Sequence, residues 1–253
     1  MHIRPFLVAA SIAALSVSAA YAITFAPGTR EDPFAPGKQC DAPMLASYGD
    51  YVYDWPSKYD LIFAPRDYPQ WVWRCETSGY VSFPHEFGAF SNDAEKARIA
   101  AYLTQSNFGS KLTALKGGLS EELYQHLEKI YALRDPDEAT HAYLMRYFAW
   151  QHKNKPAADA YRQKAIDIYK KLLAANTLKD ADLLEALYIL GFYSWKLGHK
   201  DEAKTYFEQL KSTVTIDPKT RQQKRGAPFL ENLANDVMAG KADDKVRFAN
   251  EPK

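Results

Sequence analysis

The chain has 253 residues, and its 32 Lys and Arg residues nearly balance its 31 Asp and Glu residues, so the net charge at pH 7 is +1. A near-neutral chain presents no large basic field, and we therefore expect neither nucleic acid nor an anionic membrane surface as a partner. The length is sufficient to bury one large hydrophobic core or two small ones.

The first 22 residues have the pattern of a secretory signal peptide. Arg4 supplies a positive charge, residues 6–17 form an apolar run, and small residues lead to a cleavage site after Ala22. The apolar run is shorter than the roughly 20 residues that span a membrane. We expect a periplasmic or secreted product with no membrane span after cleavage; the alternative is that this run is a hydrophobic first helix of the fold.

The chain contains two cysteines, Cys40 and Cys75. In an oxidising compartment, two cysteines favour one disulfide, which would stabilise the fold by about 4 kcal/mol in the chain-entropy model. The alternative is two buried free thiols.

Residues 23–90 are rich in aromatic residues and proline, and we expect a small β/loop subdomain there. Residues 23–39 are expected to be extended, because three prolines interrupt them. Alternating and aromatic residues predict strands at residues 51–53, 70–75 and 80–83, with a tight turn at residues 76–79.

From residue 91 to residue 238 the hydrophobic residues follow a helical period, which predicts a helical domain. Asp135 is expected to cap one helix, with Pro136 at its first position. A break is expected at residues 226–228, and residues 239–253 are expected to be a disordered tail. The predicted helices cover approximately residues 92–104, 120–131, 135–152, 156–172, 183–197, 202–210 and 217–238.

The spacing of Gly191, Gly198, Ala203 and Phe207 matches a tetratricopeptide (TPR) repeat. A glycine at position 191 lets two helices approach closely, Gly198 permits a left-handed turn, and Ala203 provides a small contact. We expect a mainly α fold in which TPR-like antiparallel helix pairs, an α-solenoid, follow a small aromatic-rich β ribbon.

Three segments, residues 68–80, 147–150 and 187–207, resemble domain-of-unknown-function family 2225. The resemblance covers roughly residues 38–225 and implies a cysteine ribbon followed by a TPR-like helical half. The ribbon of the family looks like two C-x-x-C knuckles that could hold a structural metal. Here Ser78 stands where a partner of Cys75 would be, and Cys40 also lacks a second cysteine.

Two thiolates without a nearby histidine do not make a zinc site. We therefore expect no metal and no cofactor, and our hypothesis is that a disulfide between Cys40 and Cys75 replaces the metal of the family.

The sequence shows no catalytic motif, and we expect that the protein is not an enzyme. The adjacent residues His85 and Glu86 could be a catalytic pair, but a solvent-facing or core histidine is the preferred interpretation. Neither G-x-S-x-G nor H-E-x-x-H occurs. A hydrolase site assembled from residues far apart in the sequence remains open. The other histidines considered as metal ligands lie apart on predicted helices: His126, His141, His152 and His199.

Two sets of aromatic residues are candidate binding surfaces. The first, on the predicted sheet, is either a platform for sugars or a hydrophobic core. The second, on the predicted helices, is either a groove for a partner or packing between helices. The first set is Tyr51, Tyr53, Trp55, Trp71 and Trp73, and the second, with one cation, is Tyr143, Arg146, Tyr147, Tyr188 and Phe192.

The function that we expect from these features is an exported, non-catalytic TPR-like adaptor that binds another envelope protein or peptide. The alternative is a glycan-binding module that uses the aromatic N-terminal sheet.

Overall fold

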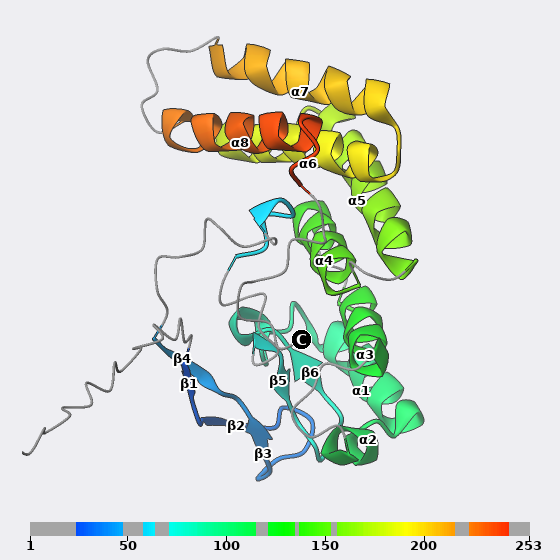
Figure 1. Cartoon of the computed structure of the whole chain (residues 1–253). Coiled ribbons are helices and arrows are strands. Elements are labelled where there is room, and N and C mark those ends of the chain that lie inside the picture. Colours follow the sequence, from blue (N-terminus) through cyan, green and yellow to red (C-terminus); the bar gives the residue numbers. More distant parts are fainter. Residues whose placement is uncertain are drawn as a thin grey trace, which may run out of the picture.

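Figure 1 shows a computed structural model of the chain, which is mainly helical with a small antiparallel sheet near the N-terminus. The structure describes residues 24–47, 58–63, 71–114, 121–134, 137–152, 156–215 and 223–242. The predicted signal peptide, the predicted strand at residues 51–53 and the tail beyond residue 242 lie outside the described residues. None of the helices in the described ranges is both long and apolar enough to cross a membrane.

The strands are short and lie in two antiparallel sheets. Four strands pair in the order β2-β3-β5-β6, and β1 pairs with β4. The segment expected to be merely extended contributes β1 and β2, and the two predicted strands around the turn at residues 76–79 are only two residues long. The strands are β1 (Thr24–Ala26), β2 (Thr29–Glu31), β3 (Gln39–Asp41), β4 (Met44–Ser47), β5 (Trp73–Arg74) and β6 (Val81–Ser82).

The described residues form eight α-helices. Helix α4 packs against α5 and α6 against α7, while α6 also contacts α5 and α8 (Figure 1). Helix α2 was not predicted, and it begins two residues after Asn107, the left-handed C-cap of α1. The helices are α1 (Asp93–Ser106), α2 (Gly109–Ala114), α3 (Glu121–Ala132), α4 (Glu138–Gln151), α5 (Ala157–Ala174), α6 (Asp180–Lys196), α7 (Lys200–Thr215) and α8 (Gln223–Met238).

Side-chain caps begin helices α1 and α4. The Asn92 side chain accepts a hydrogen bond from the Glu95 N–H and so begins α1. Helix α4 begins at Glu138, after the N-cap Asp137, whose side chain accepts the hydrogen bond from the backbone N–H of Thr140. Asp135 itself lies outside the described residues.

The end of α6 follows the predicted left-handed geometry. Gly198 has φ +85°, its N–H donates to the Trp195 carbonyl, and the His199 N–H donates to the Ser194 carbonyl. This pair of hydrogen bonds is the Schellman motif, in which glycine is favoured because it lacks a Cβ.

The predicted break at residues 226–228 is wrong, because α8 continues through Pro228. A proline ring fixes φ near the helical value, so its cost is one lost hydrogen bond and some crowding near the preceding turn. Burial of Leu230, Leu233 and Val237 on the following turns offsets part of that cost.

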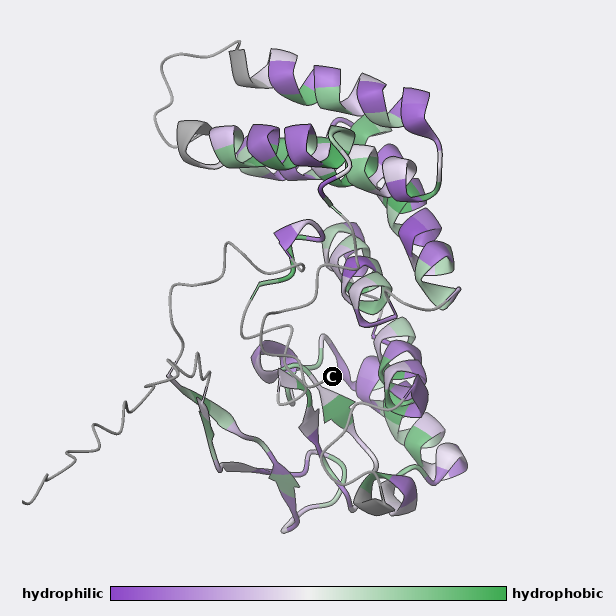
Figure 2. Ribbon diagram, in the orientation of Figure 1, coloured by the Kyte–Doolittle hydropathy of each residue, from purple (hydrophilic) through white to green (hydrophobic). Residues whose placement is uncertain are grey.

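One hydrophobic core extends through both halves of the described chain. It includes Cys40, Val81, Leu127, Tyr147 and Leu187 in a single set of contacting residues. Figure 2 shows hydrophobic residues along α6, which is covered by α7 and α8. The outward side of α7 carries hydrophilic residues. The sheet and the helices therefore share apolar surface.

Candidate functional site

The residues predicted to line a partner groove are mostly buried. Arg146 is 2% exposed, and Tyr147, Tyr188 and Phe192 are no more exposed than that, whereas Tyr143 is partly exposed. A partner cannot reach the four buried side chains. The prediction that they form an open binding surface is therefore wrong, and the alternative, packing within the protein, describes them.

Part of the inner face of the helices holds a segment of the same chain, residues 58–63, which we call the clamped segment. The Arg146 Nη2 atom donates to the carbonyls of Asp60 and Leu61, each at 3.2 Å. The hydroxyl of Tyr188 donates to the Tyr59 carbonyl at 3.0 Å, and that of Tyr193 donates to Asp60 Oδ1 at 2.9 Å.

A buried cation lies beside the clamped segment. Arg146 forms an ion pair with Glu185 and donates to the Tyr169 hydroxyl at 2.9 Å. Burial acts to lower the pKa of Arg146, but the nearby Tyr169, Glu185 and Tyr193 outweigh it and raise that pKa well above its usual value. Arg146 therefore stays charged and holds backbone carbonyls of its own chain.

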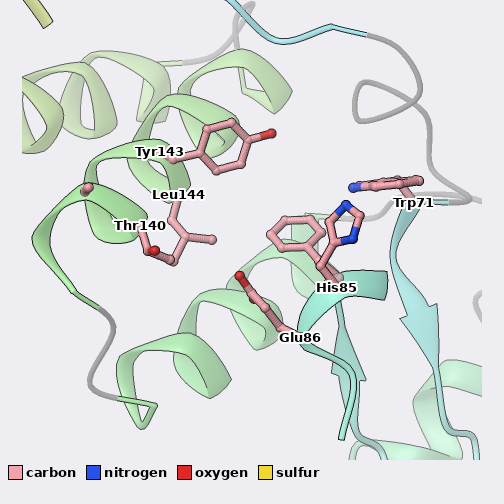
Figure 3. A pocket seen from close by; sticks show the side chains of 8 residues that line it. Trp71, His85, Glu86, Thr140, Tyr143 and Leu144 are labelled. Carbon is pink, nitrogen blue, oxygen red and sulfur yellow. The ribbon is translucent and has the colours of Figure 1, made fainter. Parts of the chain in front are cut away.

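A cavity of about 250 Å³ lies between α4 and the loop that follows β6, and we call it the aromatic pocket (Figure 3). Figure 3 shows Trp71 and His85 on one side and Tyr143, Leu144 and Thr140 of α4 on the other, with Glu86 directed between them. The lining residues are Trp71, Phe83, His85, Glu86, Ala139, Thr140, Tyr143 and Leu144.

Arg134 positions the loop side of the aromatic pocket. His85 and Glu86 lie on the 3₁₀ helix η4 (Pro84–Glu86). Arg134 Nη2 donates to the Glu86 carbonyl at 3.0 Å and also to the carbonyl of Ala89, and Nη1 donates to Ser82 Oγ at 3.3 Å. A buried guanidinium that joins several carbonyls in this way restricts the loop to one conformation.

The α4 side of the pocket is fixed by the first turn of the helix. Asp137 Oδ1 accepts the N–H of Thr140, and Oδ2 accepts its hydroxyl proton, both at 2.9 Å. The backbone N–H of Thr140 and then its hydroxyl lower the pKa of Asp137, so this carboxylate stays ionised. One turn along, the Tyr143 ring lies 5.6 Å from the guanidinium carbon of Arg146.

The aromatic pocket brings together residues that the sequence analysis assigned to different interpretations. Trp71 was a candidate for a sugar-binding platform, and His85 and Glu86 were a candidate catalytic pair. Tyr143 was a candidate for a partner-binding groove. The rings of Trp71 and His85 now make an edge contact at 5.3 Å. Phe83, Thr140 and Leu144 were not predicted to belong to a site, and no local sequence pattern marks them.

Trp73 does not share a surface with Trp71. It is 8% exposed, its Nε1 donates to the Pro43 carbonyl at 3.0 Å, and its ring packs edge-on against Phe87. The core interpretation therefore holds for Trp73. Tyr51, Tyr53 and Trp55 of the same predicted set lie outside the described residues.

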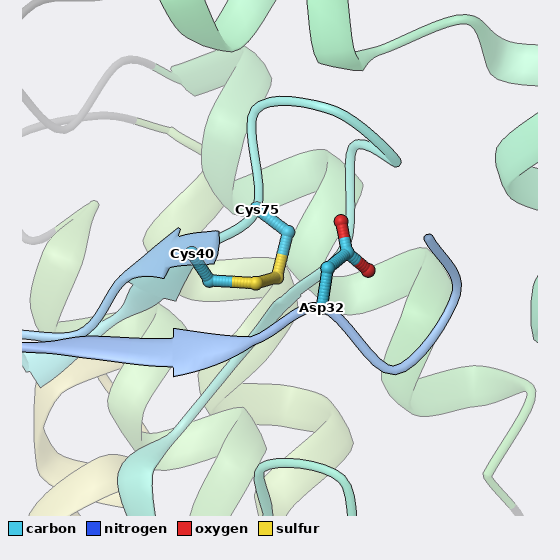
Figure 4. Close-up of side chains that lie close together, drawn as sticks. All are labelled: Asp32, Cys40 and Cys75. Carbon is cyan, nitrogen blue, oxygen red and sulfur yellow. A yellow bond between two sulfur atoms is a disulfide. The ribbon is translucent and has the colours of Figure 1, made fainter. Parts of the chain in front are cut away.

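The cysteines form the expected disulfide, with Asp32 beside it (Figure 4). The carboxylate of Asp32 accepts the N–H of Phe34 at 2.9 Å and the N–H of Ser78 at 3.3 Å. The ligand atoms of Asp32, Cys40 and Cys75 lie within 4.8 Å of one another. Because both sulfurs are bonded to each other, neither is a thiolate, and Asp32 acts here by holding the turn that follows Cys75.

The remaining candidate histidines lie in separate parts of the fold. His126 is buried, with its Nε2 2.7 Å from the Gly79 carbonyl and its Nδ1 2.9 Å from the Tyr102 hydroxyl. Burial lowers the pKa of His126 to about 4, so the ring is neutral. His152 is buried between aromatic rings, and His141 and His199 are exposed.

Comparison with known proteins identifies one family. A family model described as "Uncharacterized protein conserved in bacteria (DUF2225)" matches residues 48–227, which confirms the resemblance seen in the sequence. Neither the curated proteins nor the solved structures include a match.

Proposed function

This chain belongs to domain-of-unknown-function family 2225, and we propose that it is an exported, non-catalytic adaptor that binds a protein of the cell envelope. The aromatic pocket carries this proposal. It is a formed cavity lined by aromatic and polar side chains, which is the usual character of a recognition site. The signal-peptide pattern of the first 22 residues supports export.

In this proposal the helices are TPR-like pairs that act as a rigid frame. Support comes from the contact between α6 and α7, where an ideal Cβ built on Gly191 would lie 2.6 Å from Cδ1 of Phe207. This close approach of the two helices supports the proposed TPR-like pairing. Because the clamped segment already occupies part of the inner face, the partner is bound at the aromatic pocket.

The hydrogen bonds of the pocket support a role in binding rather than in catalysis. The hydroxyl of Thr140 donates its proton to Asp137, and the His85 ring contacts Trp71. The Thr140 hydroxyl is therefore not paired with His85 in the way that a nucleophile is paired with its general base.

Site-specific photo-cross-linking in intact bacterial cells tests the proposal. A photoreactive benzoyl-phenylalanine replaces the exposed His85 at the pocket, and in a matched control it replaces Trp195, a partly exposed residue of α6 next to Lys200. We expect one dominant adduct from position 85 and not from position 195. Absence of an adduct at position 85, or the same mixture from both positions, would contradict the proposal.

A glycan-binding module is the second candidate function, because Trp71 is partly exposed and lies beside polar groups in the same pocket. Aromatic faces stack on sugar rings, and this function predicts that Trp71→Ala abolishes retention on a cell-wall polysaccharide. Trp195→Ala is the control and should be retained. Equal retention of both variants would remove this candidate.

A further inference from the structure

The loop side of the aromatic pocket carries an excess of one negative charge. Arg134 faces two carboxylates: Glu95 Oε1 lies 3.3 Å from its Nε, and Glu86 Oε2 lies 4.0 Å from its Nη1. Glu95 is almost completely buried and is the closer partner. One guanidinium cannot neutralise two carboxylates, and the uncompensated charge is on Glu86, which lines the pocket.

One oxygen of Glu86 is available as a hydrogen-bond acceptor. Its Oε2 atom is buried and lies toward Arg134 and Tyr131, whereas the side chain as a whole is 36% exposed and lines the pocket. A cationic ligand in the pocket can therefore donate a charge-assisted hydrogen bond to the exposed part of this carboxylate.

The opposite wall of the pocket also offers an acceptor. The proton of the Thr140 hydroxyl is donated to Asp137, so the oxygen can only accept a further hydrogen bond. The backbone N–H of Thr140 is used by the same carboxylate. The positive end of the α4 dipole is therefore offset by an ionised Asp137.

Three aromatic rings surround these acceptors: Trp71, Phe83 and Tyr143. Aromatic faces attract cations, and such rings with a carboxylate form the cages that bind ammonium groups. Arg146 also contacts the Tyr143 ring, but its charge is balanced by the ion pair with Glu185. The cavity of about 250 Å³ is smaller than the pockets of drug-sized ligands and suits one long side chain.

We propose that the aromatic pocket binds the cationic end of a lysine or arginine side chain of the partner protein. Glu86 accepts hydrogen bonds from the cation, Thr140 supplies a second acceptor, and the rings of Trp71 and Tyr143 cover its apolar stem. This inference rests on the proposed adaptor function and gives the chemistry of the partner residue.

Nuclear magnetic resonance of the full chain with ¹⁵N-labelled tryptophan tests the inference. The Trp71 indole signal, assigned with Trp71→Phe, is followed on addition of acetyl-lysine amide or acetyl-arginine amide. We expect saturable shifts with at least one of them and binding about tenfold weaker with acetyl-norleucine amide, which resembles lysine in length but lacks the charge. N-acetylglucosamine is added separately to test for a glycan ligand, and we expect no saturable shift with it.

Two variants and one control assign the effect to the pocket. Glu86→Gln keeps the shape of the side chain and should weaken amine binding about tenfold, and Thr140→Val should weaken it about threefold. Glu208→Gln changes an exposed carboxylate of α7 and should have no effect. If Glu86→Gln does not fold, judged by its circular dichroism, Thr140→Val decides the outcome.

Equal binding of the norleucine compound, saturable binding of the sugar, or unchanged amine binding by the variants would overturn the inference. Failure of both cationic compounds while position 85 still cross-links to one partner would reject the cationic ligand but keep the adaptor function. Amine binding without any cross-linked partner would reject the adaptor function instead.

Discussion

At the scale of single residues, Arg146 shows how a buried charge can hold a backbone segment. Its guanidinium donates to the carbonyls of Asp60 and Leu61 and pairs with Glu185. Asp60 and Leu61 are buried, so their carbonyls depend on Arg146 for hydrogen bonds, whereas Glu185 is 43% exposed and keeps contact with water.

We expect Arg146→Met to lower the free energy of unfolding by about 2–5 kcal/mol, because it leaves the two buried carbonyls of Asp60 and Leu61 without their donor. Urea denaturation followed by circular dichroism measures this. The control is Lys171→Met, which removes an exposed ion pair with Glu138 and should cost at most about 1 kcal/mol. Equal effects of the two variants would show that Arg146 does not hold the clamped segment.

A second residue-scale prediction concerns His126. Its pKa in the folded protein is lowered to about 4, chiefly by burial, whereas the unfolded chain takes up a proton near pH 6.5. The neutral ring therefore stabilises the fold above pH 6.5, and this contribution is lost as the pH falls from 6.5 towards 4. The loss reaches about 3 kcal/mol.

Replacing His126 by Gln should reduce the difference between the unfolding free energies measured at pH 7 and pH 4.5. His199→Gln, at an exposed position, should leave that difference as in the wild type. A wild-type pH dependence in the His126→Gln variant would mean that another group is responsible.

At the scale of elements, the pairing of α6 with α7 depends on the absence of a side chain at Gly191. An ideal Cβ there would overlap the ring of Phe207. Phe207 is itself fully enclosed in the core, so its ring has little room to move.

Gly191→Ala should therefore lower the free energy of unfolding by about 1–3 kcal/mol through overpacking. Gly226→Ala is the matched control, since nothing lies near its Cβ position in α8, and it should raise stability by up to about 1 kcal/mol. Thermal unfolding distinguishes them. If Gly191→Ala stabilised the protein as much as Gly226→Ala, that outcome would contradict a close contact between α6 and α7.

The disulfide is the second element-scale feature, since it links β3 to the residue that follows β5. It closes a loop with a sequence separation of 35. Replacing both cysteines by alanine should lower the free energy of unfolding by about 4 kcal/mol in the chain-entropy model. The reduced wild type should lose a similar amount, and an unchanged stability of the double variant would argue against the bond.

At the scale of the whole molecule, the sheet and the helices share one core, and the clamped segment adds contacts from residues 58–63 to α4, α6 and α8. A shared core raises the free energy of partial unfolding, because opening one half exposes the apolar surface of the other.

We therefore expect the described parts to unfold as one unit. Native-state hydrogen exchange should give the same free energy for the slowest amides of β5, β6 and α6. A much lower value for the strands would mean that the sheet opens independently of the helices.

Local features of the sequence were sufficient to predict most helices and their order. Caps such as Asn92 and Gly198 act through hydrogen bonds to residues only a few positions away, and apolar periodicity reports which face is buried. The spacing from Gly191 to Phe207 likewise marked a close helix contact. The disulfide followed from having two cysteines and a signal-peptide pattern.

Only the tertiary structure decided what the binding residues do. Arg146 was a candidate for lining a partner groove, but its acceptors are backbone carbonyls 85 and 86 positions earlier in the chain. The aromatic pocket similarly joins Trp71 and Glu86 to Thr140 and Tyr143 across more than 50 positions. Periodicity states that a side chain is buried, whereas its neighbours depend on how distant segments pack, and that information is absent from any local pattern.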